Sequence, residues 1–244
     1  MRIEALPGLP EVRPGDDLAG LLAAAAARLE GGLRQDDVLA VAHKIVSKAE
    51  GRIVDLATVE PDERARRLAA EHGKDPRHVQ VVLDESEEIL RADRGRLICR
   101  TRHGFVCANA GVDASNAGAP GTLVLLPEDP DASARALRAR LGCAVVITDS
   151  FGRAWRTGQA EVAIGAAGLA PLDDRRGRPD SDGRPLTATL IAVADQAAAA
   201  ADLVRGKDTR EPAVRIRGLA RHVMPGDGPG AAALIRAAED DLFR

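Results

Sequence analysis

The chain has 244 residues and a formal charge of −3, with 34 basic and 37 acidic side chains spread along its length. This balance, together with three Phe, one Trp and no Tyr, excludes the basic surfaces and aromatic platforms with which proteins bind nucleic acids. No stretch reaches the roughly 18 apolar residues of a membrane span, and the first residues are charged, so neither membrane insertion nor export is predicted. Three cysteines without CxxC spacing favour a cytoplasmic protein that has no disulfide or zinc framework.

Strand and helix signals follow one another along the chain without the strict alternation of a doubly wound sheet. The predicted strands lie near the start of 1–12 and at 38–42, 96–100, 105–108, 123–126, 144–148 and 214–218. The predicted helices lie between a cap at Asp16 or Asp17 and Gly31, and at 58–72, 84–90, 133–141, 186–204 and 231–243. Residues 109–118 and 173–185 are predicted loops. These signals predict a single mixed α and β domain over residues 1–244, long enough to bury a core of its own.

The signatures of the common nucleotide-binding and hydrolytic enzymes are missing from the sequence. It contains no GxxxxGK[ST] phosphate loop, no GxGxxG, no HExxH, no GxSxG and no cysteine–histidine metal cluster. Three polar clusters remain, each directly after an apolar strand-like run, where loops most often hold binding and catalytic groups. These clusters are the candidate functional sites.

The first cluster comprises Asp113, Ser115 and Asn116, in the loop that follows the predicted strand at 105–108. One carboxylate and several short oxygen donors, close together in the sequence, suit a hard cation that takes oxygen ligands. The same residue types also form ordinary turns, so a turn that binds nothing is the alternative.

The second cluster follows the predicted buried strand at 144–148. Asp149 and Ser150 can hold a metal through adjacent carboxylate and hydroxyl oxygens. Arg153 and Arg156 can clamp carboxylate or phosphate groups with their planar guanidinium groups. The only tryptophan, Trp155, stands between these two arginines, which predicts a functional segment and not a solvated face.

The first two clusters can combine into one site. If two cations bind about 4 Å apart, Asp113 and Asp149 can share one of them and Ser150 can help to hold the second. Such an arrangement neutralises the charge of a transferring phosphoryl group.

The third cluster comprises residues 43–48, directly after the predicted strand at 38–42. A lysine at the end of an apolar strand can reach into a site and meet nucleotide phosphates as a point charge. The alternatives are solvated surface lysines and a purely structural His43. Residues 205–208 can likewise meet phosphate, although basic residues are favoured near helix C-termini in any case.

Four segments together resemble the F-420-0 gamma-glutamyl ligase family, and the resemblance covers essentially the whole chain. They are residues 46–52, 108–116, 147–153 and 202–207, in this order. The resemblance implies a mixed-sheet α+β fold of two interlaced subdomains that forms an intertwined homodimer. It also implies a reaction in which GTP phosphorylates the terminal carboxylate of coenzyme F-420-0. The amine of L-glutamate then attacks the acyl phosphate to form an amide, releasing GDP and phosphate.

The resemblance also implies roles for individual residues. Asp113 and Asp149 are expected to bind one divalent cation, Mg²⁺ or Mn²⁺, and Ser150 is expected to serve a second, with K⁺ as an open further possibility. The residues expected to bind the nucleotide are Leu9, Pro10, Glu11, Val12, His43, Lys48, Asn116 and Lys207. The expected catalytic residues are Asp149, Lys48 and Arg153.

The chain departs from the family pattern at two positions. Lys207 stands where archaeal relatives tend to have an acidic or amide side chain, and a protonated lysine cannot ligate a cation. His43 stands where serine or threonine is common. Two other functions stay open at this point: a metal-dependent phosphoryl transferase or ligase acting on another carboxylate metabolite, and a GTP-binding module without turnover.

Overall fold

The computed structural model describes residues 1–206 and 209–241. Its strands are β1 (Arg2–Ala5), β2 (Val38–Ala42), β3 (Ile53–Asp55), β4 (Ser86–Asp93), β5 (Arg96–Thr101), β6 (Val106–Ala108), β7 (Thr122–Val124), β8 (Ala144–Arg153), β9 (Arg156–Ala167), β10 (Leu172–Asp174), β11 (Leu190–Ala192) and β12 (Ala213–Arg217). Its α-helices are α1 (Leu18–Ala26), α2 (His43–Ala49), α3 (Glu63–His72), α4 (Pro76–Asp84), α5 (Pro130–Leu141) and α6 (Val193–Asp202). The predicted mixture of helices and strands is confirmed.

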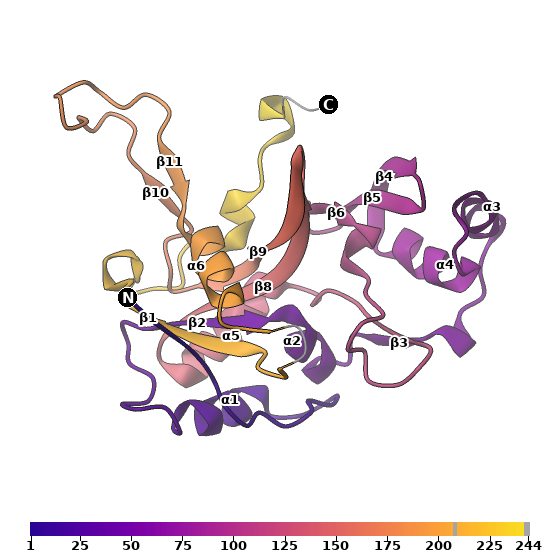
Figure 1. Cartoon of the computed structure of the whole chain (residues 1–244), viewed down its shortest axis with the longest axis horizontal. Coiled ribbons are helices and arrows are strands. Elements are labelled where there is room, and N and C mark those ends of the chain that lie inside the picture. Colours follow the sequence, from indigo (N-terminus) through magenta and orange to yellow (C-terminus); the bar gives the residue numbers. More distant parts are fainter. Residues whose placement is uncertain (207–208, 242–244) are drawn as a thin grey trace.

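The largest sheet has the strand order β1-β12-β2-β8-β9 and is mixed (Figure 1). Strands β2 and β8 are parallel, whereas the other neighbours in the sheet are antiparallel. In the parallel pair Ala42 lies opposite Thr148. The residues that follow these two positions, His43 and Asp149, therefore lie side by side at one edge of the sheet.

Alternating side chains of this sheet enter two different apolar cores, as the two-residue period of a strand requires. On β2, Leu39 and Val41 pack in the core that contains helices α1 and α5, whereas Val38 and Ala40 pack in the core that contains α6. Each of these four side chains is fully buried. Helices on both faces thus fix the position of the sheet and of the residues at its edge.

A third apolar core lies in the part of the chain between β2 and β8. It joins α3 and α4 to β5 and β7 through buried residues such as Val79, Leu97 and Leu123. In Figure 1 this part, in purple to magenta, lies beside the large sheet. The chain leaves the large sheet after α2, builds this second group of elements, and returns to the large sheet through α5 and β8.

Capping residues set several helix boundaries, and the cap predicted at Asp16 or Asp17 is confirmed at Asp17. The carboxylate of Asp17 accepts a hydrogen bond from the amide of Gly20 at the start of α1, and Asp129 accepts one from Ala132 at the start of α5. Helix α5 ends at Gly142, whose φ of 71° lies in the left-handed region that glycine tolerates. Local side-chain chemistry is sufficient to place these boundaries.

Several predicted helices are wrong or too long. The helix predicted to end at Gly31 ends at Ala26, and the helix predicted from residue 58 begins at Glu63. The helix predicted at 84–90 does not form, because α4 ends at Asp84 and β4 instead pairs with β5. Residues 186–204 divide into strand β11 and helix α6. The described part of 231–243 forms only the 3-10 turns Ala231–Leu234 and Ala238–Asp240. The carboxylate of Asp131 binds the amides of Ala231 and Ala232, which holds the first of these turns against the body of the protein.

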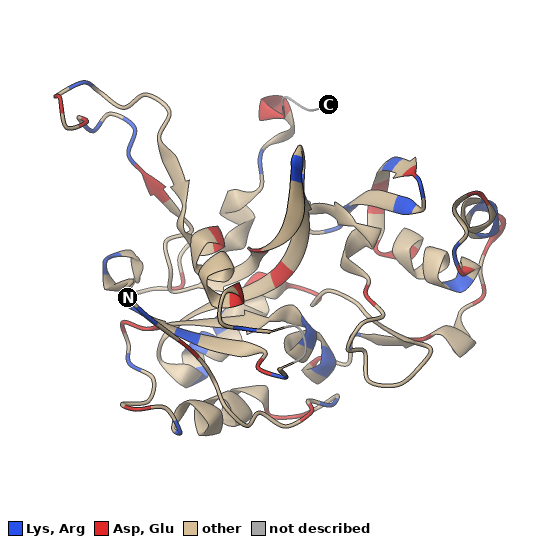
Figure 2. Cartoon of the chain, in the orientation of Figure 1, with Lys and Arg blue, Asp and Glu red and all other residues tan. Residues whose placement is uncertain are grey.

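Basic and acidic side chains are distributed over all parts of the structure (Figure 2). The β8–β9 hairpin has acidic residues along its middle and basic residues at its tip. Among the described residues, no helix has the length and apolar run that crossing a membrane needs.

Candidate active site

The parallel pair β2–β8 places His43 against Asp149. Nε2 of His43 lies 3.3 Å from Oδ1 of Asp149, and Nδ1 lies 3.3 Å from the hydroxyl oxygen of Ser47. His43 is 2% exposed, and the contact with Asp149 lacks the alignment of a hydrogen bond. Asp149 also accepts a hydrogen bond from the amide of Ser150 at 2.7 Å. The amide of Ser150 therefore holds the carboxylate, and the buried ring of His43 lies against it at the edge of the sheet.

Lys44 joins this edge to the first polar cluster. Its ammonium group lies 2.6 Å from Oδ2 of Asp113, 2.7 Å from Oγ of Ser115 and 2.9 Å from the carbonyl oxygen of Ser115. Burial alone raises the pKa of Asp113, but the hydrogen bonds from Lys44 and Ser115 outweigh burial and hold that pKa below its ordinary value. The loop thus places the carboxylate of Asp113 and two oxygens of Ser115 around the ammonium group of Lys44.

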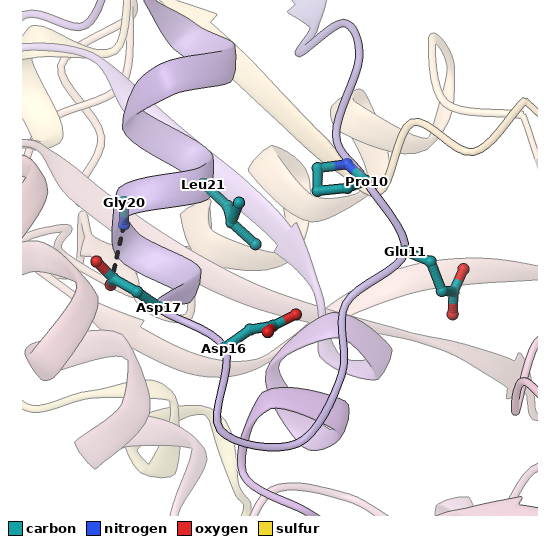
Figure 3. A pocket seen from close by; sticks show the side chains of 6 residues that line it. All are labelled: Pro10, Glu11, Asp16, Asp17, Gly20 and Leu21. Carbon is teal, nitrogen blue, oxygen red and sulfur yellow. Dashed lines mark hydrogen bonds between the residues drawn. The ribbon is translucent and has the colours of Figure 1, made fainter.

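The second lysine of α2, Lys48, forms an ion pair with Glu11. Lys48 is 6% exposed, so its ammonium group is largely removed from water. Glu11 and Pro10 line a hollow of about 370 Å³ at the start of α1, together with Asp16, Asp17, Gly20 and Leu21 (Figure 3). The neighbouring Leu9 and Val12 pack into the adjacent core instead.

A buried chain of polar contacts lies on the other side of Asp149. The hydroxyl of Ser150 donates a hydrogen bond to Oε1 of Glu161, its direct partner across the β8–β9 ladder. Nη2 of Arg205 lies 2.8 Å from Oε2 of Glu161 and 2.9 Å from Oγ1 of Thr148. The side chains of Arg205 and Glu161 are each 6% exposed, so this ion pair is almost completely buried.

The remaining residues predicted for the site lie farther along the hairpin or in loops. Arg153 and Arg156 face each other at the tip of the β8–β9 hairpin, where Arg153 donates to the carbonyl of Thr157 at 2.8 Å. Trp155 is 79% exposed, so the expectation that it avoids a solvated face is wrong. Its φ of 58° places it in the tight turn, from which its ring projects into solvent. Asn116, exposed, lies in the loop that follows Asp113.

Lys207, the remaining predicted nucleotide-binding residue, lies outside the described residues. Sequence reasoning placed Lys44 in the third cluster without assigning it a role of its own, and it missed Glu161, which the fold brings to the site. The signal for Glu161 was a single carboxylate that opens the apolar run of β9.

The donor atoms at this edge are carboxylate and hydroxyl oxygens from Asp113, Asp149 and Ser150. Hard oxygen ligands of this kind fit Mg²⁺ and Mn²⁺ and do not favour softer metals. No cluster of three or more His, Cys, Asp or Glu side chains with metal-binding geometry occurs within the described ranges. Oxygens from a ligand or from water must therefore complete the shell of any cation bound here.

These features define an α+β enzyme fold whose charged residues collect at the carboxyl ends of two parallel strands, where α/β proteins commonly bind ligands. The family described as F420-0:Gamma-glutamyl ligase matches residues 8–218 of the chain. The chain therefore belongs to this family of ligases.

Proteins of the same family are similar to the chain over nearly its full length. The coenzyme F420:L-glutamate ligase of Methanopyrus kandleri is 49% identical over 252 residues, which cover 100% of this chain and 98% of that protein. The coenzyme F420:L-glutamate ligase of Methanothermobacter thermautotrophicus is 46% identical and covers 97% of this chain and 96% of its own length. The protein of that name from Natronomonas pharaonis is also 46% identical, covering 100% of this chain and 95% of its own.

Proposed function

We propose that this ligase joins L-glutamate to the terminal carboxylate of coenzyme F-420-0 through an amide bond, in a GTP-dependent reaction that releases GDP and phosphate. The full-length similarity to proteins named coenzyme F420:L-glutamate ligase supports the substrates. The acyl-phosphate route is supported by chemistry, since a free carboxylate is a poor acyl donor and phosphorylation gives it a good leaving group.

One structural observation supports this proposal above the others. The four segments that carry the family resemblance, although distant in the sequence, have residues at one edge of the large sheet. Ser47 of the first segment contacts His43, which in turn contacts Asp149 of the third. Arg205 of the fourth segment binds Thr148 of the third, and Lys44, next to His43, reaches Asp113 of the second. A reaction between three charged substrates needs such a convergence, because much of the catalysis is positioning and charge neutralisation.

Asp113, Asp149 and Ser150 are the proposed ligands of two divalent cations. A divalent cation at this position neutralises charge on a transferring phosphoryl group. Lys48 is proposed to hold the nucleotide phosphates. Its buried ammonium group, which is paired with Glu11, would then bind phosphate oxygens in place of that carboxylate. Arg153 is proposed to act at the carboxylate or phosphate of the acceptor, with a guanidinium that can bind such groups through two parallel hydrogen bonds.

The hollow beside Pro10 and Glu11 is the proposed position of the nucleotide base. Its acidic lining disfavours phosphate but suits a base edge that carries N–H donors. Guanine presents two adjacent donors that one carboxylate can accept together, whereas the corresponding edge of adenine presents only its amino group. This difference supports GTP as the preferred nucleotide.

The proposal includes a homodimer that works in the cytoplasm. The β8–β9 hairpin and the arm that contains β10 and β11 project from the rest of the chain (Figure 1). Exposed apolar residues such as Trp155 on the hairpin and Leu190 on the arm suit contact with a second copy. The three buried free cysteines suit a reducing compartment. Light scattering on the purified protein tests the dimer directly.

The reaction is tested by incubating the protein with GTP, L-glutamate, F-420-0 and either Mg²⁺ or Mn²⁺. The expected result is an acceptor whose mass increases by one glutamyl unit, together with one GDP for each amide bond. The matched reaction with ATP in place of GTP tests the choice of nucleotide. Release of GDP without a mass gain would indicate another acceptor, and nucleotide binding without release of GDP would contradict turnover.

A further inference from the structure

We infer that Glu161 is a positioning residue that orients the hydroxyl of Ser150 so that its lone pairs face a bound divalent cation. The inference rests on the proposed role of Ser150 as a cation ligand. Glu161 itself contacts Ser150 and Arg205, and its effect on the cation is exerted through the serine hydroxyl.

The fold brings the two side chains together through strand register. Ser150 on β8 and Glu161 on β9 are directly opposed across the antiparallel ladder, so their side chains emerge on the same face of the sheet. The hydroxyl of Ser150 donates its hydrogen to Oε1 of Glu161, and the backbone amide of Ser150 donates to Asp149. The hydroxyl hydrogen and the amide hydrogen of Ser150 therefore both point toward carboxylates.

A hydroxyl group can ligate a cation only through its oxygen lone pairs. A free serine rotates, and in many of its orientations the hydrogen points toward the ligand position, where it repels a positive ion. Because Glu161 accepts that hydrogen, it fixes one orientation of the hydroxyl, in which the oxygen lone pairs point away from the hydrogen. Hydrogen-bond acceptors behind a metal ligand commonly act in this way.

Arg205 explains why a nearly buried carboxylate is available for this role. An ionised carboxylate removed from water is costly unless a partner of opposite charge compensates it. Arg205 supplies that charge at 2.8 Å from Oε2 of Glu161, and Thr148 fixes the same guanidinium group at 2.9 Å. The ion pair also prevents Glu161 from adding a full net negative charge to the proposed cation site. Arg205 thus holds Glu161 in place as the acceptor for the serine hydroxyl.

The experiment measures Mn²⁺ affinity on the full chain by following the electron paramagnetic resonance signal of free Mn²⁺. Four proteins form a double-mutant cycle: the wild type, Ser150→Ala, Glu161→Ala, and the double variant. Glu161→Ala is expected to weaken Mn²⁺ binding by about tenfold. In the Ser150→Ala background the same change is expected to have no further effect, because the hydroxyl that Glu161 orients is gone.

A purely structural role for Glu161 predicts a different result. In that case the two single losses in Mn²⁺ affinity multiply in the double variant, and this outcome overturns the inference while the proposed cation site stands. If Ser150→Ala leaves Mn²⁺ affinity unchanged, or if the wild type binds no Mn²⁺, the proposed cation role of Ser150 fails and the inference fails with it.

Asp131→Asn provides a matched control for loss of stability. Asp131 also binds strand β9, where its Oδ1 accepts a hydrogen bond from the amide of Ala166 at 2.8 Å, but it contacts none of the site residues named above. This variant is expected to lower the melting temperature and to retain the Mn²⁺ affinity of the wild type. A tenfold loss of Mn²⁺ affinity in Asp131→Asn would show that general loosening of β9 is enough, and would overturn the inference.

Discussion

Nζ of Lys44 lies 2.6 Å from Oδ2 of Asp113, although the two residues are 69 positions apart in the chain. The contact ties the first turn of α2 to the loop that follows β6. It links the large sheet to the part of the structure that has its own core, and it holds a carboxylate proposed to bind a cation. The relationship therefore has consequences for stability as well as for the site.

Replacing Lys44 by methionine is expected to loosen the loop at 113–118. The pair is partly exposed, so we expect a loss of about 0.5–1 kcal/mol in the free energy of unfolding. Urea unfolding measures this loss, and limited proteolysis should show faster cleavage in the loop. Lys44→Arg keeps the positive charge and should retain most of the stability. Equal cleavage rates in Lys44→Met and the wild type would contradict a role for this contact in ordering the loop.

Replacing Asp149 by asparagine is expected to abolish most of the ligase activity without unfolding the protein. The change removes a negative charge from the proposed cation site and keeps the size of the side chain, so we expect a loss of roughly 100-fold or more in turnover. The melting temperature should change by less than about 4 °C. Asp93→Asn, at the end of β4, is the matched control and should keep full activity. Wild-type turnover in Asp149→Asn would refute the assignment.

Glycine at position 165 is required by the packing of β9 against α5. A Cβ atom there would lie 2.3 Å from the carbonyl oxygen of Pro130, which is backbone and cannot move aside easily. Gly165→Ala should therefore destabilise the protein by about 2 kcal/mol or more in urea unfolding. Gly152→Ala is the control in the same sheet, because a Cβ there meets nothing within 4 Å. We expect its effect to stay within about 0.5 kcal/mol, and comparable losses in both variants would contradict this explanation.

The carboxylate of Asp37 should make the stability depend on pH in the acid range. Burial raises its pKa, but hydrogen bonds from Arg217 and from the amide of Arg34 outweigh burial, so the pKa in the folded protein lies below its ordinary value. A depressed pKa stabilises the fold above the unfolded-state pKa of about 3.9, and the stabilisation is lost as the pH falls through the folded pKa.

Asp37→Asn is therefore expected to cost about 2 kcal/mol at pH 7, where Arg217 loses its partner. The difference from the wild type should shrink steadily once the pH is below about 4. Urea unfolding of both proteins at several pH values measures it. A difference that stays constant down to the acid transition would show that the charge of Asp37 has no part in the effect.

The cysteines should be unreactive in the folded protein. Burial raises the pKa of Cys143 to about 12, with the charge of Asp37 as a smaller cause. Burial also raises the pKa of Cys107 to about 12, and the nearby carboxylate of Asp149 adds to this effect. Because the thiolate is the nucleophile, Ellman's reagent at pH 8 should react negligibly with the native protein and with three thiols after unfolding. Rapid reaction of any native thiol would contradict the burial of that cysteine.

Local signals predicted those elements whose cause lies within a few residues. The strand at 38–42 is an uninterrupted apolar run, and the predicted cap Asp17 binds an amide of its own helix. The predicted helix at 84–90 failed because its charged residues have no conflict with a helix along their own segment. Pairing with β5, the next strand along the chain, makes them a strand.

The candidate site shows the same division between local and distant causes. The sequence by itself determined which residue types follow the strand ends, among them Asp113, Asp149 and Lys48, and it contained the four segments that resemble the ligase family. Only the tertiary structure decided that Lys44 meets Asp113 and that Glu161 lies opposite Ser150 and accepts its hydrogen bond. Caps and apolar runs depend on neighbours along the chain, whereas these pairings depend on strand order and register, which are set by the burial of side chains from the whole molecule.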